Sequence, residues 1–193
     1  MVNGQERTAT SIPTKKIILW IGMASMTMLF AGLTSAYIVR QAEGNWAKFD
    51  LPAFFSISTG ALLVSSITMN RSVAAAKKGN ISFLRSMLLI TFLLGITFVF
   101  LQFAGWKELV THNVVFAGKT SNPSGSFLYV LTGLHLSHLA GGMLALLYCI
   151  FDVTKNAKNF AAKNILSVEL SAIFWHFLTG LWIYLFLFLL LVR

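Results

Sequence analysis

Long runs of apolar residues dominate the chain and determine the fold class that it predicts. Five runs approach or exceed the ~20 residues that a helix needs to cross a ~30 Å hydrocarbon layer. They cover residues 17–39, 51–69, 81–104, 127–151 and 165–192. Because backbone amides find no water in lipid, each run is expected to form a helix that satisfies them internally. The pattern predicts an all-α polytopic bundle of five transmembrane helices.

The polar segments divide the chain into a tail and one membrane domain. Residues 1–16 form a polar tail, and residues 17–193 form the predicted five-helix domain. The second helix is expected to continue through the alanines at 74–76 until Gly79 and Asn80 stop it, and Asn80 or Ser82 is expected to cap the third. The longest connection is expected from about Gly105 to Gly125, with a turn signal at its end.

Charge sets the expected orientation. Only 11% of the 193 residues are charged, against about a quarter in soluble domains. The net charge is +9, and the 15 basic residues are divided unevenly between the two sides of a five-helix arrangement. Ten basic residues fall on one side: Arg7, Lys15, Lys16, Arg71, Lys77, Lys78, Arg85, Lys155, Lys158 and Lys163. Five fall on the other: Arg40, Lys48, Lys107, Lys119 and Arg193. The positive-inside rule then predicts a cytoplasmic N-terminus and a periplasmic C-terminus, with basic loops near anionic lipid rather than nucleic acid.

Small residues mark the expected helix contacts. In lipid, helices associate through close packing and polar links rather than through a hydrophobic drive. The fourth run carries a stripe of small residues four apart, and the first and second runs carry shorter versions. The packing positions predicted are Gly32, Gly133, Ser137, Gly141, Gly142 and Ala145.

Four ionisable residues lie within the spans and are the candidate site residues. His135 and His138 are three apart on the fourth run, whereas Glu169 and His176 are seven apart on the fifth. Such groups are costly in lipid and usually face a partner or a cavity. His138 and His176 are expected near mid-membrane and facing the helix interior, and Glu169 nearer the cytoplasmic face.

These residues favour structural roles over chemistry. His135 and His138 are too close along one helix to ligate opposite faces of a heme, and a di-iron carboxylate site needs about four Glu and two His. The single Cys149 excludes a multi-cysteine metal site and is expected to pack. We expect no metal and no catalytic residue: the four residues are expected to pack through hydrogen bonds or to contact lipid head groups, with Glu169 in a hydrogen bond. A metal site and a proton-handling Glu169 stay open as the less favoured alternatives.

Four motifs occur in order along the runs. The first run contains Phe30-Ala31-Gly32, and the third contains Leu94-Gly95 followed by Phe98, Leu101 and Gln102. The fourth contains Thr132-Gly133-Leu134-His135-Leu136-Ser137-His138, followed by Gly142. The fifth contains Glu169, then Trp175-His176-Phe177, then Trp182. These stretches resemble the F-A-G, L-G-x-x-F-x-x-L-Q, T-G-x-H-x-x-H and E-x-x-x-x-x-W-H-F-x-x-x-x-W segments of cytochrome c oxidase subunit III. The resemblance covers nearly the whole chain from residue 17 onward.

The resemblance implies a non-catalytic subunit of a heme-copper oxidase in a bacterial inner membrane. Such a subunit packs beside catalytic subunit I and other oxidase subunits, binds phospholipid, supports proton uptake and protects the enzyme during turnover. Heme and copper are expected in partner subunits only. The chain resembles the five-helix form, which lacks the first two helices of larger members. In larger members those two helices splay away and leave a cleft that holds phospholipids.

Two positions depart from the family pattern. Many members carry a glutamate four residues before the F of F-A-G, where this chain has Met26. The acidic residue expected after W-H-F-x is Thr179 here. We therefore expect no proton-related role at either position.

Alternative functions remain at this point. Subunit III of a quinol oxidase and the related accessory protein of nitric oxide reductase share similar motifs, because electron-donor choice lies in another subunit. A stand-alone transporter would need a polar pathway or broken helices. The spans here are mostly uninterrupted, which disfavours it.

Overall fold

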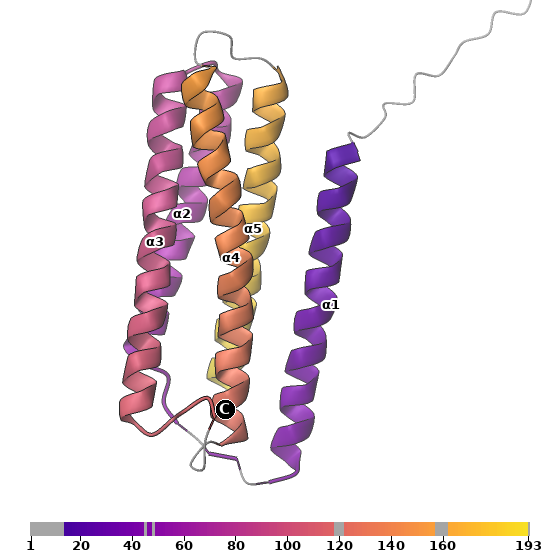
Figure 1. Ribbon diagram of the computed structural model, residues 1–193, viewed down its shortest axis with the longest axis vertical. Helices are drawn as coiled ribbons and strands as arrows, with labels where there is room; N and C mark the ends of the chain where they lie inside the picture. Colours follow the sequence, from indigo (N-terminus) through magenta and orange to yellow (C-terminus); the bar gives the residue numbers. More distant parts are fainter. Residues whose placement is uncertain (1–13, 45, 48, 118–121, 157–161, 193) are drawn as a thin grey trace, which may run out of the picture.

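A computed structural model describes residues 14–44, 46–47, 49–117, 122–156 and 162–192. Within these residues the chain forms five helices, each long and apolar enough to cross a membrane, which confirms the all-α five-span prediction. They are α1 (Thr14–Ala42), α2 (Ala53–Lys77), α3 (Ile81–Thr111), α4 (Pro123–Lys155) and α5 (Ala162–Leu191) (Figure 1). Most of the polar tail and the basic residues Arg7, Lys48, Lys119, Lys158 and Arg193 lie outside the described residues.

The helices extend beyond the apolar runs. α3 continues to Thr111, so the long connection does not begin near Gly105 as predicted. The reason is that Lys107 and Glu108 have high helix propensity although they are polar. The helix therefore continues past the end of the apolar run. α4 begins earlier than predicted because Asn122 caps it, accepting a hydrogen bond from the backbone N–H of Ser124.

The turn between α2 and α3 follows the prediction. α2 ends at Lys77, and Gly79 adopts the left-handed conformation with φ of +69°. Asn80 then caps α3, with its Oδ1 accepting from the N–H of Phe83 at 3.1 Å. A two-residue stop of this kind brings α2 and α3 back side by side as antiparallel neighbours.

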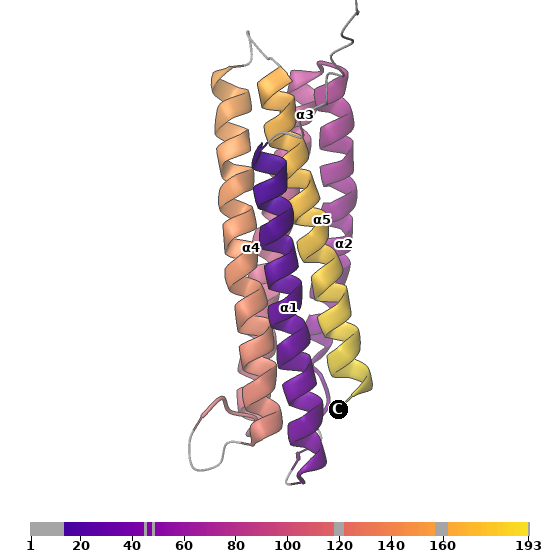
Figure 2. The same cartoon turned by 90° about the vertical axis from the view of Figure 1, so that its right-hand side faces the viewer.

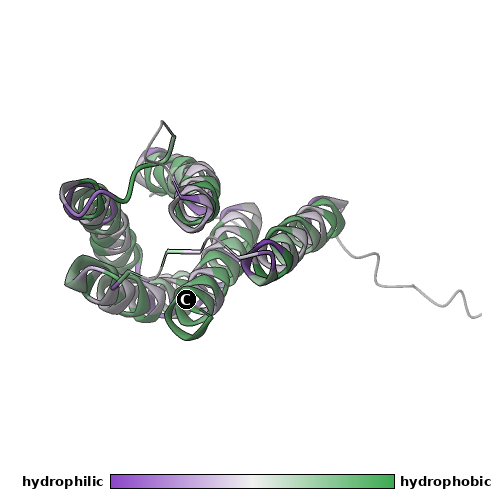
Figure 3. Ribbon diagram, turned by 90° about the horizontal axis from the view of Figure 1, so that it is seen from below, coloured by the Kyte–Doolittle hydropathy of each residue, from purple (hydrophilic) through white to green (hydrophobic). Residues whose placement is uncertain are grey.

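Four of the helices form a closed group, and α1 stands outside it. α2 contacts α3, α3 contacts α4, α4 contacts α5, and α5 contacts α2. Among the described residues, α1 contacts only α4 and α5. Figure 1 shows α1 leaning away from α4 and α5 at one end, Figure 2 shows α1 in front of these two helices, and Figure 3 shows apolar residues on every helix.

Aromatic residues fill the centre of the four-helix group. Trp182 of α5 packs edge-on to Phe98 of α3, with ring centroids 4.9 Å apart, and stacks with Phe55 of α2 at 6.2 Å. A Cβ added at Gly95 would lie 2.9 Å from Trp175 Cη2. Glycine at this position therefore lets α3 pack closely against the buried indole of Trp175.

The stripe on α4 packs differently from the prediction. Only Gly142 lies close to another helix, since a Cβ there would be 2.8 Å from Leu178 Cδ1 of α5. Ser137 and Gly141 are exposed, and nothing lies within 4 Å of a Cβ added at Gly141. Ser137 lies two residues from each of the buried positions His135 and Leu139. Two residues correspond to about half a helical turn, so the stripe faces the outside of the group.

The other predicted packing positions are also loosely covered. Gly32 on α1 is exposed, with nothing within 4 Å of an added Cβ. Gly133 comes no nearer than 4.0 Å to Trp106, and Ala145 is half-buried. Apart from Gly142, these residues do not make tight contacts between the helices of this chain.

Candidate functional site

Two indole groups of α5 donate hydrogen bonds to hydroxyl groups of α2. Trp175 Nε1 donates to Ser65 Oγ at 3.0 Å, and Trp182 Nε1 donates to Thr59 Oγ1 at 2.9 Å. Each hydroxyl in turn donates to a carbonyl of its own helix. Because that bond uses the only hydroxyl hydrogen, the lone pairs are left to accept from the neighbouring helix.

The same arrangement recurs at two other helix contacts. Gln102 Nε2 of α3 donates to Ser58 Oγ of α2 at 2.8 Å, and Trp106 Nε1 of α3 donates to Thr132 Oγ1 of α4 at 3.1 Å. Both hydroxyl groups again donate within their own helices. Ser and Thr therefore act as acceptors for side-chain N–H groups across the bundle, without leaving a donor unsatisfied in lipid.

His176 bridges α5 to α2 through both ring nitrogens. Nδ1 lies 2.6 Å from Ser66 Oγ, and Nε2 lies 3.1 Å from Asn70 Oδ1. Because a carbonyl oxygen can only accept, Nε2 donates to Asn70, and the neutral ring then accepts from Ser66 at Nδ1. Both polar atoms of the imidazole are thus engaged in holding two helices together.

Glu169 is ion-paired with Lys77 of α2. Glu169 Oε1 lies 2.9 Å from Lys77 Nζ, and the side chains are 36% and 59% exposed, respectively. The pair lies near the end of the group where α2 turns into α3 (Figure 1). An exposed pair of this kind contributes about 0–1 kcal/mol, so it orients the helix ends more than it stabilises them.

These contacts form one continuous feature, which we call the α2–α5 ladder. On α5 its members are Glu169, Trp175, His176 and Trp182. On α2 they are Lys77, Asn70, Ser66, Ser65 and Thr59. The ladder follows most of the length of both helices.

The two histidines of α4 lie in different surroundings. His135 is fully buried, 5.0 Å from Trp182 and 5.9 Å from Phe98 between ring centroids. Neither of its ring nitrogens has a hydrogen-bond partner among the described residues. His138 is half-buried, with Nδ1 2.7 Å from the carbonyl of Leu134 and its ring 5.8 Å from Phe30 of α1. The structure therefore does not bring His138 and His176 together, since one faces α1 and the other faces α2.

A groove separates α1 from α5. It has a volume of about 510 Å³ and a largely apolar lining. The lining residues are Thr27, Phe30, Ala31, Phe177, Gly180, Leu181 and Tyr184. Beside it, the hydroxyl groups of Thr34 and Tyr184 lie 2.9 Å apart, and they link α1 to α5.

Sequence reasoning missed the α2 half of the ladder. Ser, Thr and Asn are tolerated in spans and were not singled out, although α2 is the least hydropathic of the five spans. The high content of Ser and Thr in this span is the signal from which the acceptor face could have been predicted. No group of three or more His, Cys, Asp or Glu that could hold a metal is found among the described residues.

Comparisons with known proteins agree with the motifs. The family model for cytochrome c oxidase subunit III matches residues 45–192. A probable cytochrome c oxidase subunit 3 from Mycobacterium tuberculosis is 34% identical over 184 residues, covering 91% of this chain and 86% of its own length. Cytochrome c oxidase subunit 3 from Bacillus sp. is 28% identical over 187 residues, covering 94% and 87%. Cytochrome bo(3) ubiquinol oxidase subunit 3 from Pseudomonas aeruginosa is 28% identical over 172 residues, covering 86% and 79%. The chain belongs to the cytochrome c oxidase subunit III family.

Proposed function

We propose that this chain is a non-catalytic subunit III of a cytochrome c oxidase in a bacterial inner membrane. It packs beside the catalytic subunit and supports proton uptake and stability of that subunit during turnover. Heme and copper are bound by the catalytic subunit and the other oxidase subunits. The observation that carries this proposal is the α2–α5 ladder. The polar residues of the α5 motif hold α5 to α2, which supports a structural role for them.

The outward stripe of α4 is the surface best suited to a partner helix. Ser137 and Gly141 are exposed, and their small size would let the backbone of a partner helix approach closely. Gly141→Leu should leave the fold of this chain intact but reduce its recovery with the catalytic subunit. Equal recovery would move the partner surface elsewhere, for example to the exposed face of α1.

The groove between α1 and α5 suits a phospholipid acyl chain. Its lining is almost entirely apolar, it opens to the membrane, and only Thr27 and Tyr184 bring hydroxyl groups to it. An acyl chain there would support α1, which has few contacts of its own.

Co-purification tests the oxidase assignment. An affinity-tagged chain extracted in mild detergent should carry heme absorbance and copper, whereas a stand-alone transporter would be recovered without them. In the assembled enzyme, His176→Ala or Glu169→Ala should shorten activity during turnover without removing the heme spectrum. Absence of heme from every preparation would contradict the proposal.

A quinol oxidase is the second candidate, because the similar Pseudomonas aeruginosa protein is named as a ubiquinol oxidase subunit. The accompanying subunits decide between the two. A partner subunit with a dinuclear copper domain favours cytochrome c as electron donor. A partner that lacks it favours quinol, or the related accessory role in nitric oxide reductase.

A further inference from the structure

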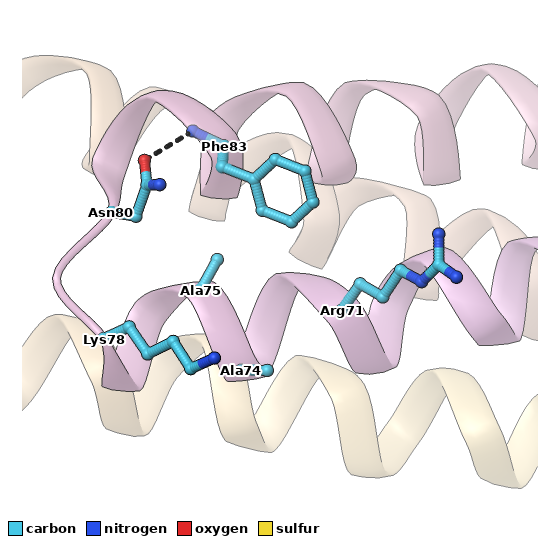
Figure 4. Close-up of a pocket in the computed structure, with 6 residues that line it drawn as sticks. All are labelled: Arg71, Ala74, Ala75, Lys78, Asn80 and Phe83. Carbon is cyan, nitrogen blue, oxygen red and sulfur yellow. Dashed lines mark hydrogen bonds between the residues drawn. The ribbon is translucent and has the colours of Figure 1, made fainter.

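A cavity of about 480 Å³ opens on the outside of the bundle where α2 turns into α3. α2 and its C-cap supply one wall, and the start of α3 supplies the other (Figure 4). The lining residues are Arg71, Ala74, Ala75, Lys78, Asn80 and Phe83. None of them belongs to the α2–α5 ladder or to the groove between α1 and α5.

Two cations stand on one side of this cavity. Arg71 and Lys78 are seven residues apart, which places them two turns apart on the same face of α2, about 10 Å along its axis. Among the described residues the ion pairs are Arg40 with Glu43 and Lys77 with Glu169, so neither Arg71 nor Lys78 is paired there. Both charges are therefore available to an anionic ligand.

The rest of the lining is apolar. Ala74 and Ala75 form a low floor between the two cations, and the Phe83 ring projects from α3 over the same stretch (Figure 4). The Asn80 side chain is an uncharged amide whose oxygen accepts from the N–H of Phe83, so it leaves the charge of the two cations uncompensated. A large aromatic ring that is 44% exposed beside two unpaired cations suits an amphiphile rather than a simple ion.

The position along the bundle agrees with that chemistry. α2 and α3 are 25 and 31 residues long, which exceeds the ~20 residues needed to cross the hydrocarbon layer. Their joined ends therefore reach the head-group region, where Arg and Lys direct their charge while their stems lie along apolar surface.

We propose that this cavity binds an anionic phospholipid. The phosphate lies between Arg71 and Lys78, beside Ala74, and an acyl chain runs from there over the Phe83 ring toward the bilayer centre. Free phosphate shares the charge but makes no use of the apolar wall. The site extends the lipid binding proposed above to a second place and rests only on that part of the proposed function, since it involves neither the oxidase partner nor turnover.

Photolabelling tests the site directly. The full chain, purified with its accompanying subunits, is placed in phosphatidylcholine nanodiscs that contain phosphatidylglycerol with a photoreactive acyl chain. Peptides covering residues 71–85 should be labelled, and unlabelled phosphatidylglycerol should compete whereas inorganic phosphate should not. Labelling on α1 or α5 reports the other groove separately.

Two variants and one control decide whether the labelling is specific. Arg71→Gln with Lys78→Gln should weaken labelling about twenty-five-fold, since each of the two charges that flank the phosphate contributes about five-fold. Ala74→Trp keeps both charges but fills the cavity, and should also abolish labelling. Arg85→Gln removes one charge nearby from a residue that does not line the cavity, and should change labelling by less than about two-fold.

Three outcomes would overturn the proposal. The first is undiminished labelling in the double variant, and the second is displacement by inorganic phosphate alone. The third is an equal loss in Arg85→Gln, which would reduce the effect to general surface charge. Circular dichroism of each variant shows that the loss does not come from unfolding.

Discussion

The four helices α2–α5 and the outlying helix α1 are apolar to a similar degree but are held in place very differently. α4 buries residues along its whole length, whereas α1 buries only Met23, Phe30, Thr34 and Tyr37. The family model likewise begins at residue 45, so it covers α2–α5 and leaves α1 out. In lipid, apolar composition alone does not attach a helix to its neighbours; fitted glycines and polar side chains do.

Tryptophan truncation should separate the two regions most strongly. Trp182→Ala should lower the free energy of unfolding by about 3 kcal/mol, the low end for an aromatic core residue, because lipid removes the hydrophobic term but the cavity remains. Trp20→Ala on the exposed face of α1 should change it by less than about 0.5 kcal/mol. SDS unfolding followed by circular dichroism measures both. Similar values would mean that α1 belongs to the same packed core.

Added bulk gives the next largest contrast. Gly95→Leu should cost about 2 kcal/mol, since its Cβ alone would meet the Trp175 ring at 2.9 Å. Gly22→Leu on α1 meets nothing within 4 Å and should be close to neutral. The same SDS titration applies. A tolerated Gly95→Leu would show that α3 can move away from α5 at little cost.

The ladder should be weaker, bond by bond, than the aromatic core. A double-mutant cycle with Ser65→Ala and Trp175→Phe should give a coupling energy of about 0.6 kcal/mol, the usual value for hydrogen bonds between membrane helices. Ser56→Ala, on the exposed side of α2, is the control. A coupling energy near zero would mean that proximity, not hydrogen bonding, joins α2 and α5 there.

The smallest effect is expected between α1 and α5. Tyr184→Phe removes the hydroxyl that lies 2.9 Å from Thr34 Oγ1. It should leave unfolding of α2–α5 unchanged within about 0.5 kcal/mol, but broaden the distance distribution between spin labels on α1 and α4. Tyr148→Phe, an exposed position on α4, should broaden nothing. An unchanged distribution in Tyr184→Phe would assign the attachment of α1 to its aromatic contacts alone.

Helix number and the α2–α3 turn could be predicted because they depend on local signals. Apolar length predicts a span, and Gly79 with Asn80 predicts the stop and the cap. The direction of the α4 stripe could not be predicted in the same way. A smooth row of small residues looks the same whether it faces a helix of its own chain or a partner, and Gly141 faces outward although Gly142 packs inward.

The candidate site was predicted on one helix and missed on the other. Glu169 and His176 stand out because ionisable groups are rare in spans, but Ser65 and Ser66 do not, since serine is ordinary there. Only the antiparallel contact of α2 with α5 brings the two sets together. Pairing between distant spans is a property of the packed bundle and not of either segment.

We infer that the histidines of the spans pack helices together and bind no cofactor. The heme content of the assembled oxidase tests this inference most directly. His135→Ala, His138→Ala and His176→Ala are each purified through a tag on this chain, and heme, copper and SDS stability are measured. We predict unchanged heme and copper per catalytic subunit in all three, with lower stability in His176→Ala. Loss of heme or copper from an enzyme that still contains the catalytic subunit would contradict this.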